Sequence, residues 1–325
     1  PSAMDWSLVS HGDGKFSRLH FEGVQMTTFL AILFDGAIYA SWLFLVAAGL
    51  TVIYGVMRVL NMAHGSFYAI GAYSAASLVG WYFSGAPGNP YWSYLLMLGS
   101  ALLAGLFVGL CVERGLLRFM QGKDEILMVI VTYALMLILE DLTKLVWGVD
   151  PYFAYQPYRL LGQAEIAEGL RFANYDFALI LISVGIGLGV WFVLNRTNKG
   201  RLLTALIHDR EIAVAMGVNV NTMFTLTFVI GASLGTLAGA LTAPAISVTP
   251  GIGVEVVILA FAVVVVGGLG SIGGAAAGAV LVGLTRSLAV HLAPEIELFV
   301  IYGVMFLVLS IRPQGLFGQT LVRRI

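Results

Sequence analysis

Charge is the scarcest property of this chain. Asp, Glu, Lys and Arg make up only 11% of its 325 residues, whereas soluble domains carry about 25%. The net charge of −1 gives no electrostatic support for nucleic-acid binding. Cys111 is the single cysteine, so no disulfide can form within the chain. The five histidines and this cysteine show no metal-ligand spacing, and we expect no metal site.

Apolar residues are abundant instead, at 59% of the sequence. Many runs reach the length of about 20 helical residues that a bilayer crossing needs. The sequence therefore predicts an all-α fold, a polytopic transmembrane bundle of about 8–10 spans with Gly-rich broken helices. The first expected helix and the 254–267 helix are the two for which we allow a break or a partial crossing. The expected helices are 27–50, 64–83, 93–112, 126–146, 176–195, 222–243, 254–267, 272–292 and 297–312.

The expected organisation is a polar or amphipathic segment (1–26), a membrane domain (27–318) and a short tail (319–325). The first segment lacks a continuous apolar core, so we expect no cleavable signal peptide there. Cytoplasmic loops of membrane proteins are rich in Lys and Arg. Placing loop 195–221 in the cytoplasm puts most of these residues inside, predicts a cytoplasmic C-terminus and leaves loop 147–176 outside. The side of the N-terminus stays open.

Two short motifs resemble enzyme signatures. The stretch 268–273 matches G-x-G-x-x-G, but a dinucleotide site needs a βαβ unit and an acidic residue about 20 positions further on. The stretch 231–235 matches G-x-S-x-G without the strand–turn–helix context of that motif. Closely packed helices or a helix break explain both glycine patterns better. An intramembrane hydrolase with Ser233 and a histidine partner, His64 or His291, is the least favoured alternative.

Broken helices are where membrane transporters place their substrate path, because unwound backbone offers hydrogen-bonding groups within the membrane. Two segments here have this character, 61–78 and 266–283. Each follows an apolar run, contains Gly-Ser and then opens a helix of small residues. The pair suggests an internal repeat.

The first of these segments carries the polar residues of the expected break. Asn61, His64 and Ser66 would lie where a helix stops and restarts. Gly65 would adopt a left-handed conformation that a Cβ atom disfavours. For His64 we weigh a structural role, such as capping the broken end through a carbonyl, against direct contact with substrate, and the structural role is favoured.

Four acidic residues lie in or near apolar spans, where an ionisable group is costly and is a functional hypothesis by default. They are Asp35, Glu140, Asp141 and Glu255. Lys144 follows Glu140 by four positions, which predicts an ordinary ion pair. Glu255 is expected at the outer mouth of the path, and a simple rim position is the plainer alternative.

The stretch "GLTVIYGVMRVLNMAHG" at 49–65 resembles the signature of Liv-type permeases, the membrane subunits of ABC importers for branched-chain amino acids. It resembles the LivH-like half more than the LivM-like half. The residues that carry this match are Gly49, Thr51, Tyr54, Gly55, Asn61, Ala63, His64 and Gly65. Three further blocks agree: the Gly-rich stretch 267–283, the ending "IRPQGLFG" at 311–318, and the loop that contains Gly200, Arg201, Ala205, Asp209, Ala213 and Gly217.

The resemblance spans about residues 27 to 318 and implies a non-enzymatic permease subunit, multi-pass in a bacterial inner membrane. It implies three kinds of partner: a second, LivM-like permease, two cytoplasmic ATP-binding subunits, and an external or periplasmic substrate-binding protein. The partners would hydrolyse ATP with Mg, because this chain lacks a G-x-x-x-x-G-K-[ST] loop and needs no cofactor. The implied cargo is a branched-chain amino acid or a related small polar solute, such as urea or a short amide. A stand-alone channel or secondary transporter is the first alternative.

Two groups of site residues follow. The expected substrate path contains Tyr54, Asn61, His64, Gly65, Ser66, Glu255, Gly268 and Ser271. The expected ATPase-coupling segment is a short helix that docks into a partner's groove, with a solvated loop helix as the alternative; it contains Gly200, Arg201, Ala205, Asp209, Arg210, Glu211 and Gly217. Leu259 stands where the family often has Lys. This departure, together with Glu255, favours a zwitterionic, neutral or cationic solute over a dicarboxylate.

Overall fold

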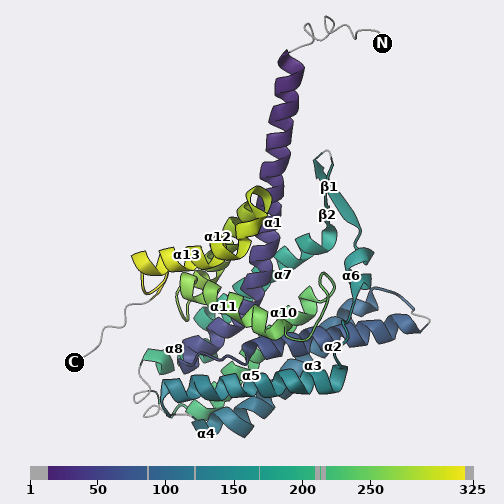
Figure 1. Ribbon diagram of the computed structural model, residues 1–325. Coiled ribbons are helices and arrows are strands. Elements are labelled where there is room, and N and C mark those ends of the chain that lie inside the picture. The colour runs from purple at the N-terminus through teal and green to yellow at the C-terminus, as the bar shows by residue number, and fades with distance from the viewer. Residues whose placement is uncertain are drawn as a thin grey trace, which may run out of the picture.

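The fold is helical almost throughout (Figure 1). The computed structural model describes residues 14–85, 88–120, 122–167, 169–208, 213 and 217–318. The helices are α1 (Gly14–Met57), α2 (His64–Ser84), α3 (Trp92–Val112), the π-helix η2 (Glu113–Leu117), α4 (Arg118–Met120), α5 (Glu125–Trp147), α6 (Tyr155–Leu160), α7 (Asn174–Arg196), α8 (Asn198–His208), α10 (Val220–Thr242), α11 (Ile252–Gly267), α12 (Ile272–Leu292), the 3-10 helix η3 (Pro294–Ile296) and α13 (Glu297–Ile311). The strands β1 (Gln163–Ala167) and β2 (Leu170–Ala173) pair as an antiparallel hairpin between α6 and α7.

The predicted polytopic bundle is confirmed. Each expected membrane helix has a counterpart in the described chain, with ends that agree to within a few residues except for α1, which starts before and ends after the expected 27–50. Six of the described helices are long and apolar enough to cross a membrane, and α11 is one of two shorter apolar helices. The first helix is continuous: α1 runs unbroken to Met57 and passes through residues 26 and 27, where a segment boundary was expected.

Two helices occupy the centre of the bundle. The α1 helix packs on α7, α10, α11 and α12, and α10 packs also on α2 and α3. Helices in a bilayer gain little from the hydrophobic effect and associate through close packing of small residues. Accordingly, Ala47, Ala48, Ala232 and Ala238 are fully buried where these helices meet.

The loops gather at the two ends of the bundle. Phe34 of α1 contacts Phe172 of the hairpin, with ring centroids 5.5 Å apart, and Phe177 at 5.7 Å. The N-terminal part of α1 therefore projects at the same end as the hairpin (Figure 1). At the other end, Gly55 approaches Gly270. If loop 147–176 is external, as predicted, the start of α1 is external too.

Candidate substrate path and coupling segment

The connection between α1 and α2, residues 58–63, is the first predicted break. Arg58 has a φ of 55°, a left-handed conformation that turns the chain directly after α1. Asn61 then organises the start of α2: its Oδ1 accepts a hydrogen bond from the Ala63 amide at 3.2 Å, and its carbonyl accepts one from the His64 amide at 3.2 Å. The helix thus stops and restarts where Asn61 and His64 were predicted to lie.

The α5 helix fastens this break from the side. The Thr132 hydroxyl donates to the Leu60 carbonyl and accepts from the Met62 amide, each at 3.3 Å. Ser66 lies inside α2, where its hydroxyl is 3.4 Å from the Met136 carbonyl and donates to it. Ser66 therefore joins α2 to α5 and does not cap the break.

His64 is fully enclosed by helices. Its side chain has no exposed surface, and its Nε2 lies 3.0 Å from the Val46 carbonyl of α1. Gly49 on α1 and Gly235 on α10 provide the space that the imidazole fills. The hydrogen bond joins the start of α2 to the middle of α1, which supports the structural role. Contact with substrate stays a prediction.

We expect His64→Ala to lower the free energy of unfolding of the permease by about 2–4 kcal/mol, because it removes a buried hydrogen bond and leaves a cavity. The chain should still insert and assemble, with lower uptake per assembled complex. The measurements are the midpoint of heat-induced loss of the gel-filtration peak in detergent and solute uptake. Ser74→Ala, on the same helix, is the control. An unchanged midpoint and uptake in His64→Ala would contradict the structural role.

The expectation of a left-handed Gly65 is wrong. Gly65 lies in the first turn of α2, and it is not among the described glycines with positive φ. Glycine is needed at this position because two backbones approach closely. An ideal Cβ atom on Gly65 would be 1.9 Å from the carbonyl oxygen of Gly253, at the start of α11. Two helix starts therefore meet backbone to backbone within the bundle.

The second predicted break separates α11 from α12. Gly268 and Gly270 have φ angles of 109° and 80°, which favour glycine. Ser271 caps α12, because its hydroxyl accepts a hydrogen bond from the Gly274 amide at 3.0 Å. The G-x-G-x-x-G motif is thus a helix-to-helix connection. The two breaks both precede a helix of small residues, but only the second has a serine cap.

The segment 316–317 holds this second break in place through backbone hydrogen bonds. The Leu316 and Phe317 amides donate to the Val266 and Gly267 carbonyls, each at 2.9 Å. These carbonyls belong to the last turn of α11. The family-like ending at 311–318 therefore packs against the Gly-rich connection.

The predicted path residues fall into separate places. Tyr54 and Ser271 line one pocket of about 340 Å³, formed by the ends of α1 and α7, by α8 and by the second break. Asn61, His64 and Gly65 are buried at the start of α2. Glu255 is exposed on the first turn of α11. The predicted path residues therefore do not share one pocket among those described.

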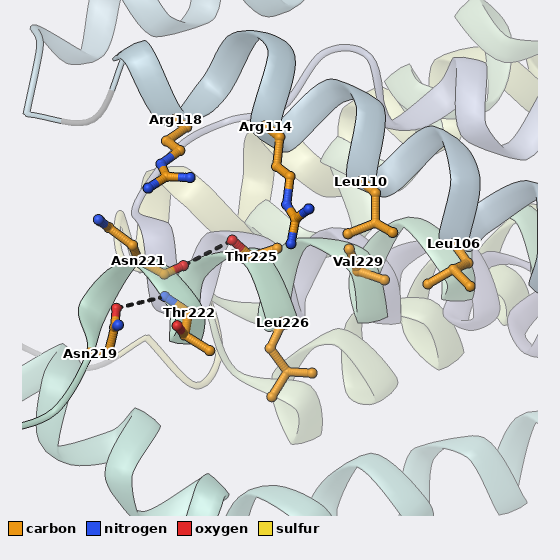
Figure 2. Close-up of a pocket in the computed structure, with 10 residues that line it drawn as sticks. All are labelled: Leu106, Leu110, Arg114, Arg118, Asn219, Asn221, Thr222, Thr225, Leu226 and Val229. Atoms are coloured by element: carbon orange, nitrogen blue, oxygen red, sulfur yellow. Dashed lines mark hydrogen bonds between the residues drawn. The ribbon is translucent and has the colours of Figure 1, made fainter.

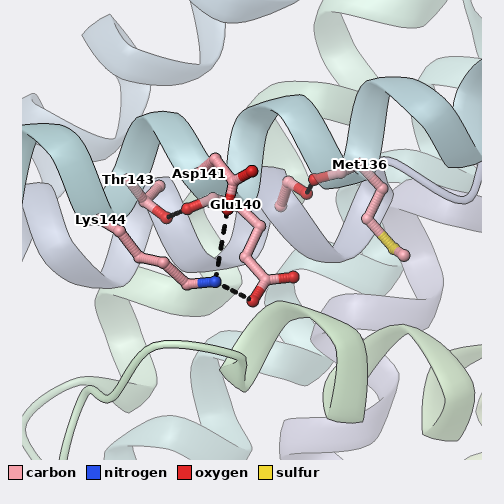
Figure 3. Close-up of polar contacts among 6 residues, drawn as sticks. Met136, Glu140, Asp141, Thr143 and Lys144 are labelled. Carbon is pink, nitrogen blue, oxygen red and sulfur yellow. Dashed lines mark hydrogen bonds and ion pairs between the residues drawn. The ribbon is translucent and has the colours of Figure 1, made fainter. Parts of the chain in front are cut away.

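The predicted ion pair of α5 is confirmed. Lys144 Nζ lies 2.9 Å from a Glu140 carboxylate oxygen and 3.5 Å from an Asp141 oxygen (Figure 3). Glu140 also lines a narrow crevice with Ser66 and with Gly251 and Gly253 at the start of α11. Pairing with Lys144 thus gives both acidic residues an ion-pair partner.

One sizeable pocket with charged side chains in its lining was missed by the sequence reasoning. It measures about 490 Å³ and lies at the hairpin end of the bundle, and its polar and aromatic lining comprises Asp35, Tyr39, Trp42, Asp176, Thr242, Arg286, Ser287 and His291. Asp35 lies 3.3 Å from His291. The Arg286 guanidinium stacks 3.9 Å from the centre of the Tyr39 ring and pairs with Glu297. The pocket therefore presents both signs of charge beside apolar side chains.

A tyrosine outside the membrane spans orients one of these carboxylates. The Tyr158 hydroxyl, on α6, donates to the Asp176 carboxylate at 2.8 Å. Burial raises the pKa of Tyr158 above its ordinary value. The phenol therefore keeps its proton at neutral pH and remains the donor.

The predicted coupling segment begins as a helix, α8, which packs on α7 and α1. Gly200 fits tightly: an ideal Cβ atom there would be 2.1 Å from the Val193 carbonyl oxygen. Arg201 is exposed, and it donates to Asn198 within the same turn. Gly217, near the start of α10, has a φ of 82°. Asp209, Arg210 and Glu211, and the side chain of Ala205, lie outside the described residues.

A family model described as "branched-chain amino acid transport system / permease component" matches residues 32–309. The chain belongs to this family. The permease is 28% identical over 304 residues to the branched-chain amino acid permease BraD of Pseudomonas aeruginosa, a match that covers 91% of this chain and 98% of BraD. It is 26% identical over 317 residues to LivH of Escherichia coli, covering 93% and 99%. It is also 28% identical over 296 residues to LivM of Escherichia coli, covering 84% and 67%.

The geometry gives the hydrolase alternative no support in this permease. Gly105 of α3 packs against Ser233, whereas Gly235, two positions further along α10, faces the His64 ring. Residues two positions apart point to nearly opposite sides of a helix. Ser233 therefore points toward α3, while His64 of α2 packs against the other side of α10, and this pair does not form.

Proposed function

We propose that this permease is the LivH-like subunit of an ABC importer for branched-chain amino acids or a related small polar solute. The observation that supports it is the family match over nearly the whole chain, together with relatives named as branched-chain amino acid permeases. Separate subunits would supply the ATP hydrolysis. The membrane in question would be the bacterial inner membrane, with the C-terminus in the cytoplasm.

The proposed partners are a LivM-like permease, two cytoplasmic ATP-binding subunits and an external substrate-binding protein. The similarity to both LivH and LivM supports a pairing of two related permeases. The α8 helix, at the Lys- and Arg-rich end, would meet the ATP-binding subunits. The hairpin end, with the 490 Å³ pocket, would face the binding protein.

The pocket at the hairpin end suits a zwitterion. Asp35 and Asp176 can attract an ammonium group and Arg286 a carboxylate, while Ile38, Leu179 and Ile246 offer apolar contact for an aliphatic side chain. We propose that the released solute first contacts the permease there. From this pocket the solute would pass toward the breaks that Asn61 and Ser271 organise.

The decisive experiment is uptake by the reconstituted complex. The permease, its LivM-like partner and the ATP-binding subunits are placed in liposomes, with the binding protein outside and ATP inside. We expect leucine uptake that needs ATP, the binding protein and both permeases, and that excess isoleucine or valine suppresses. Suppression by urea or acetamide instead would reassign the solute. Leucine flux through this chain alone, without ATP, would favour the stand-alone channel or secondary transporter.

A further inference from the structure

A second sizeable pocket lies at the opposite end of the bundle, away from the predicted path. It measures about 380 Å³ and lies between the last turns of α3 with η2 and α4 on one side and the first turns of α10 on the other (Figure 2). None of the predicted path or coupling residues lines it. Its ten lining residues are Leu106, Leu110, Arg114, Arg118, Asn219, Asn221, Thr222, Thr225, Leu226 and Val229.

The lining changes from polar to apolar along the pocket. On the first wall, Arg118, Arg114, Leu110 and Leu106 follow one another at intervals of four residues and form one row (Figure 2). The α10 wall changes in the same direction, because Asn219, Asn221 and Thr222 precede Leu226 and Val229. The two helices run antiparallel, so the polar ends coincide and the apolar ends coincide. The pocket therefore has one hydrophilic end and one apolar end.

The two arginines at the hydrophilic end have no acidic partner in the described part of the chain. Both are exposed, and neither takes part in an ion pair there. Glu113 precedes Arg114 but is fully buried, and its carboxylate oxygens make no hydrogen bond. Figure 2 shows both guanidinium groups turned toward α10, over the pocket. Two unpaired positive charges thus converge on one space.

The apolar end opens onto the surface of a membrane-spanning helix. Large apolar side chains of α3 are exposed beside it: Leu103 at 70%, Phe107 at 69% and Leu106 at 46%. A spanning helix with little burial presents such side chains to acyl chains. The pocket therefore continues from the membrane boundary into the lipid-facing surface, on the side that the Lys and Arg distribution predicts to be cytoplasmic.

We propose that this pocket binds one anionic phospholipid of the adjacent leaflet, with its phosphate between Arg114 and Arg118. Arginine pairs with phosphate through two parallel hydrogen bonds, and basic pockets between membrane helices suit anionic headgroups. Asn221 and Thr222 offer further polar contacts to the headgroup. One acyl chain lies along Leu110 and the apolar end of the pocket. A soluble phosphate or a partner's carboxylate would leave that apolar end empty, which favours a lipid.

The test uses the complete permease complex in detergent, with phosphatidylglycerol as the probe. Native mass spectrometry counts the lipid retained as its concentration rises, and phosphatidylcholine and inorganic phosphate are the comparison probes. We expect one saturable phosphatidylglycerol per permease chain, weaker binding in high salt, and no comparable retention of the other two. The double variant Arg114→Gln/Arg118→Gln should weaken binding by about tenfold or more, because two charge-assisted contacts are lost.

The matched control removes two arginines from the same side of the bundle but away from the pocket: Arg196→Gln/Arg312→Gln, both exposed. A second arm tests the apolar end. Leu226→Trp should fill the acyl site and displace the lipid, whereas Leu103→Trp, outside the pocket, should not. Equal phosphatidylglycerol binding by the Arg114/Arg118 variant and its control would overturn the proposal. Retention of inorganic phosphate alone, or no effect of Leu226→Trp, would overturn the lipid assignment.

Discussion

Gly65→Val is expected to abolish uptake and to deplete the assembled permease, whereas Gly80→Val should leave both close to wild type. The two glycines lie on the same helix, α2, so the two substitutions have the same intrinsic effect on helix propensity and on the hydrophobicity of the span. At Gly65, an added Cβ atom would be 1.9 Å from the Gly253 carbonyl oxygen and 2.8 Å from the Val257 side chain. At Gly80, apart from the adjacent backbone of α2 itself, no atom lies within 4 Å of that position.

The cost at Gly65 cannot be relieved by a side-chain rotation. The atom in the way is backbone of the first turn of α11, and the approach is reciprocal, since a Cβ on Gly253 would lie 2.7 Å from the Gly65 carbonyl. Overpacking in a core costs about 1–3 kcal/mol when neighbours can adjust, and more when they cannot. The valine must therefore push α2 and α11 apart, which also disturbs the enclosed His64.

Uptake per assembled complex and the gel-filtration peak in detergent measure this prediction for Gly65→Ala, Gly65→Val and Gly80→Val. Alanine already carries the clashing Cβ atom, so Gly65→Ala should also lower uptake and the amount of assembled permease. Equal tolerance of valine at 65 and 80 would mean that α2 and α11 do not meet as described. The polar cluster at 55–73 would then be separate from the start of α11.

Local patterns in the sequence predicted the features that depend on neighbours along the chain. The helix spans follow from apolar runs, the break at Asn61 follows from polar residues next to a helix start, and the Glu140–Lys144 pair follows from its spacing. Each of these depends on residues within about one or two helical turns. Their success therefore needs no knowledge of how the helices are arranged.

Features that depend on the arrangement of helices were missed or were explained wrongly. Gly65 was predicted to matter because of its own backbone, but its constraint comes from Gly253, on a helix far along the chain. Asp35 was named as one of four acidic residues in or near apolar spans, but Asp176 and Arg286, which share its pocket, come from α7 and α12 and were not associated with it. No periodicity within one helix reports which face of another helix it will meet. The predicted path residues consequently turned out to be spread over several places.

The second large effect is expected in the coupling segment, where Gly217→Pro should abolish uptake while the permease still inserts and assembles. Gly217 has a φ of 82°, and proline fixes φ near about −65°. The turn that leads from the coupling segment into α10 therefore cannot form with proline. The membrane spans contain no part of this turn, because Gly217 is exposed and precedes α10. Loss of ATPase coupling should dominate.

Gly122→Pro is the matched control, since Gly122 has a φ of 81° with open space around it, in a turn that precedes α5. It imposes the same backbone conflict on the same predicted side of the membrane, but outside the coupling segment. Substrate-stimulated ATPase activity of the complex and uptake are measured for both variants, and for Asp209→Lys. Only the coupling-segment variants should lose stimulation. Normal ATPase stimulation in Gly217→Pro and Asp209→Lys would mean that the ATP-binding subunits contact another part of the permease. An equal loss of ATPase stimulation in Gly122→Pro would mean that backbone strain in any turn on this side is enough to cause it.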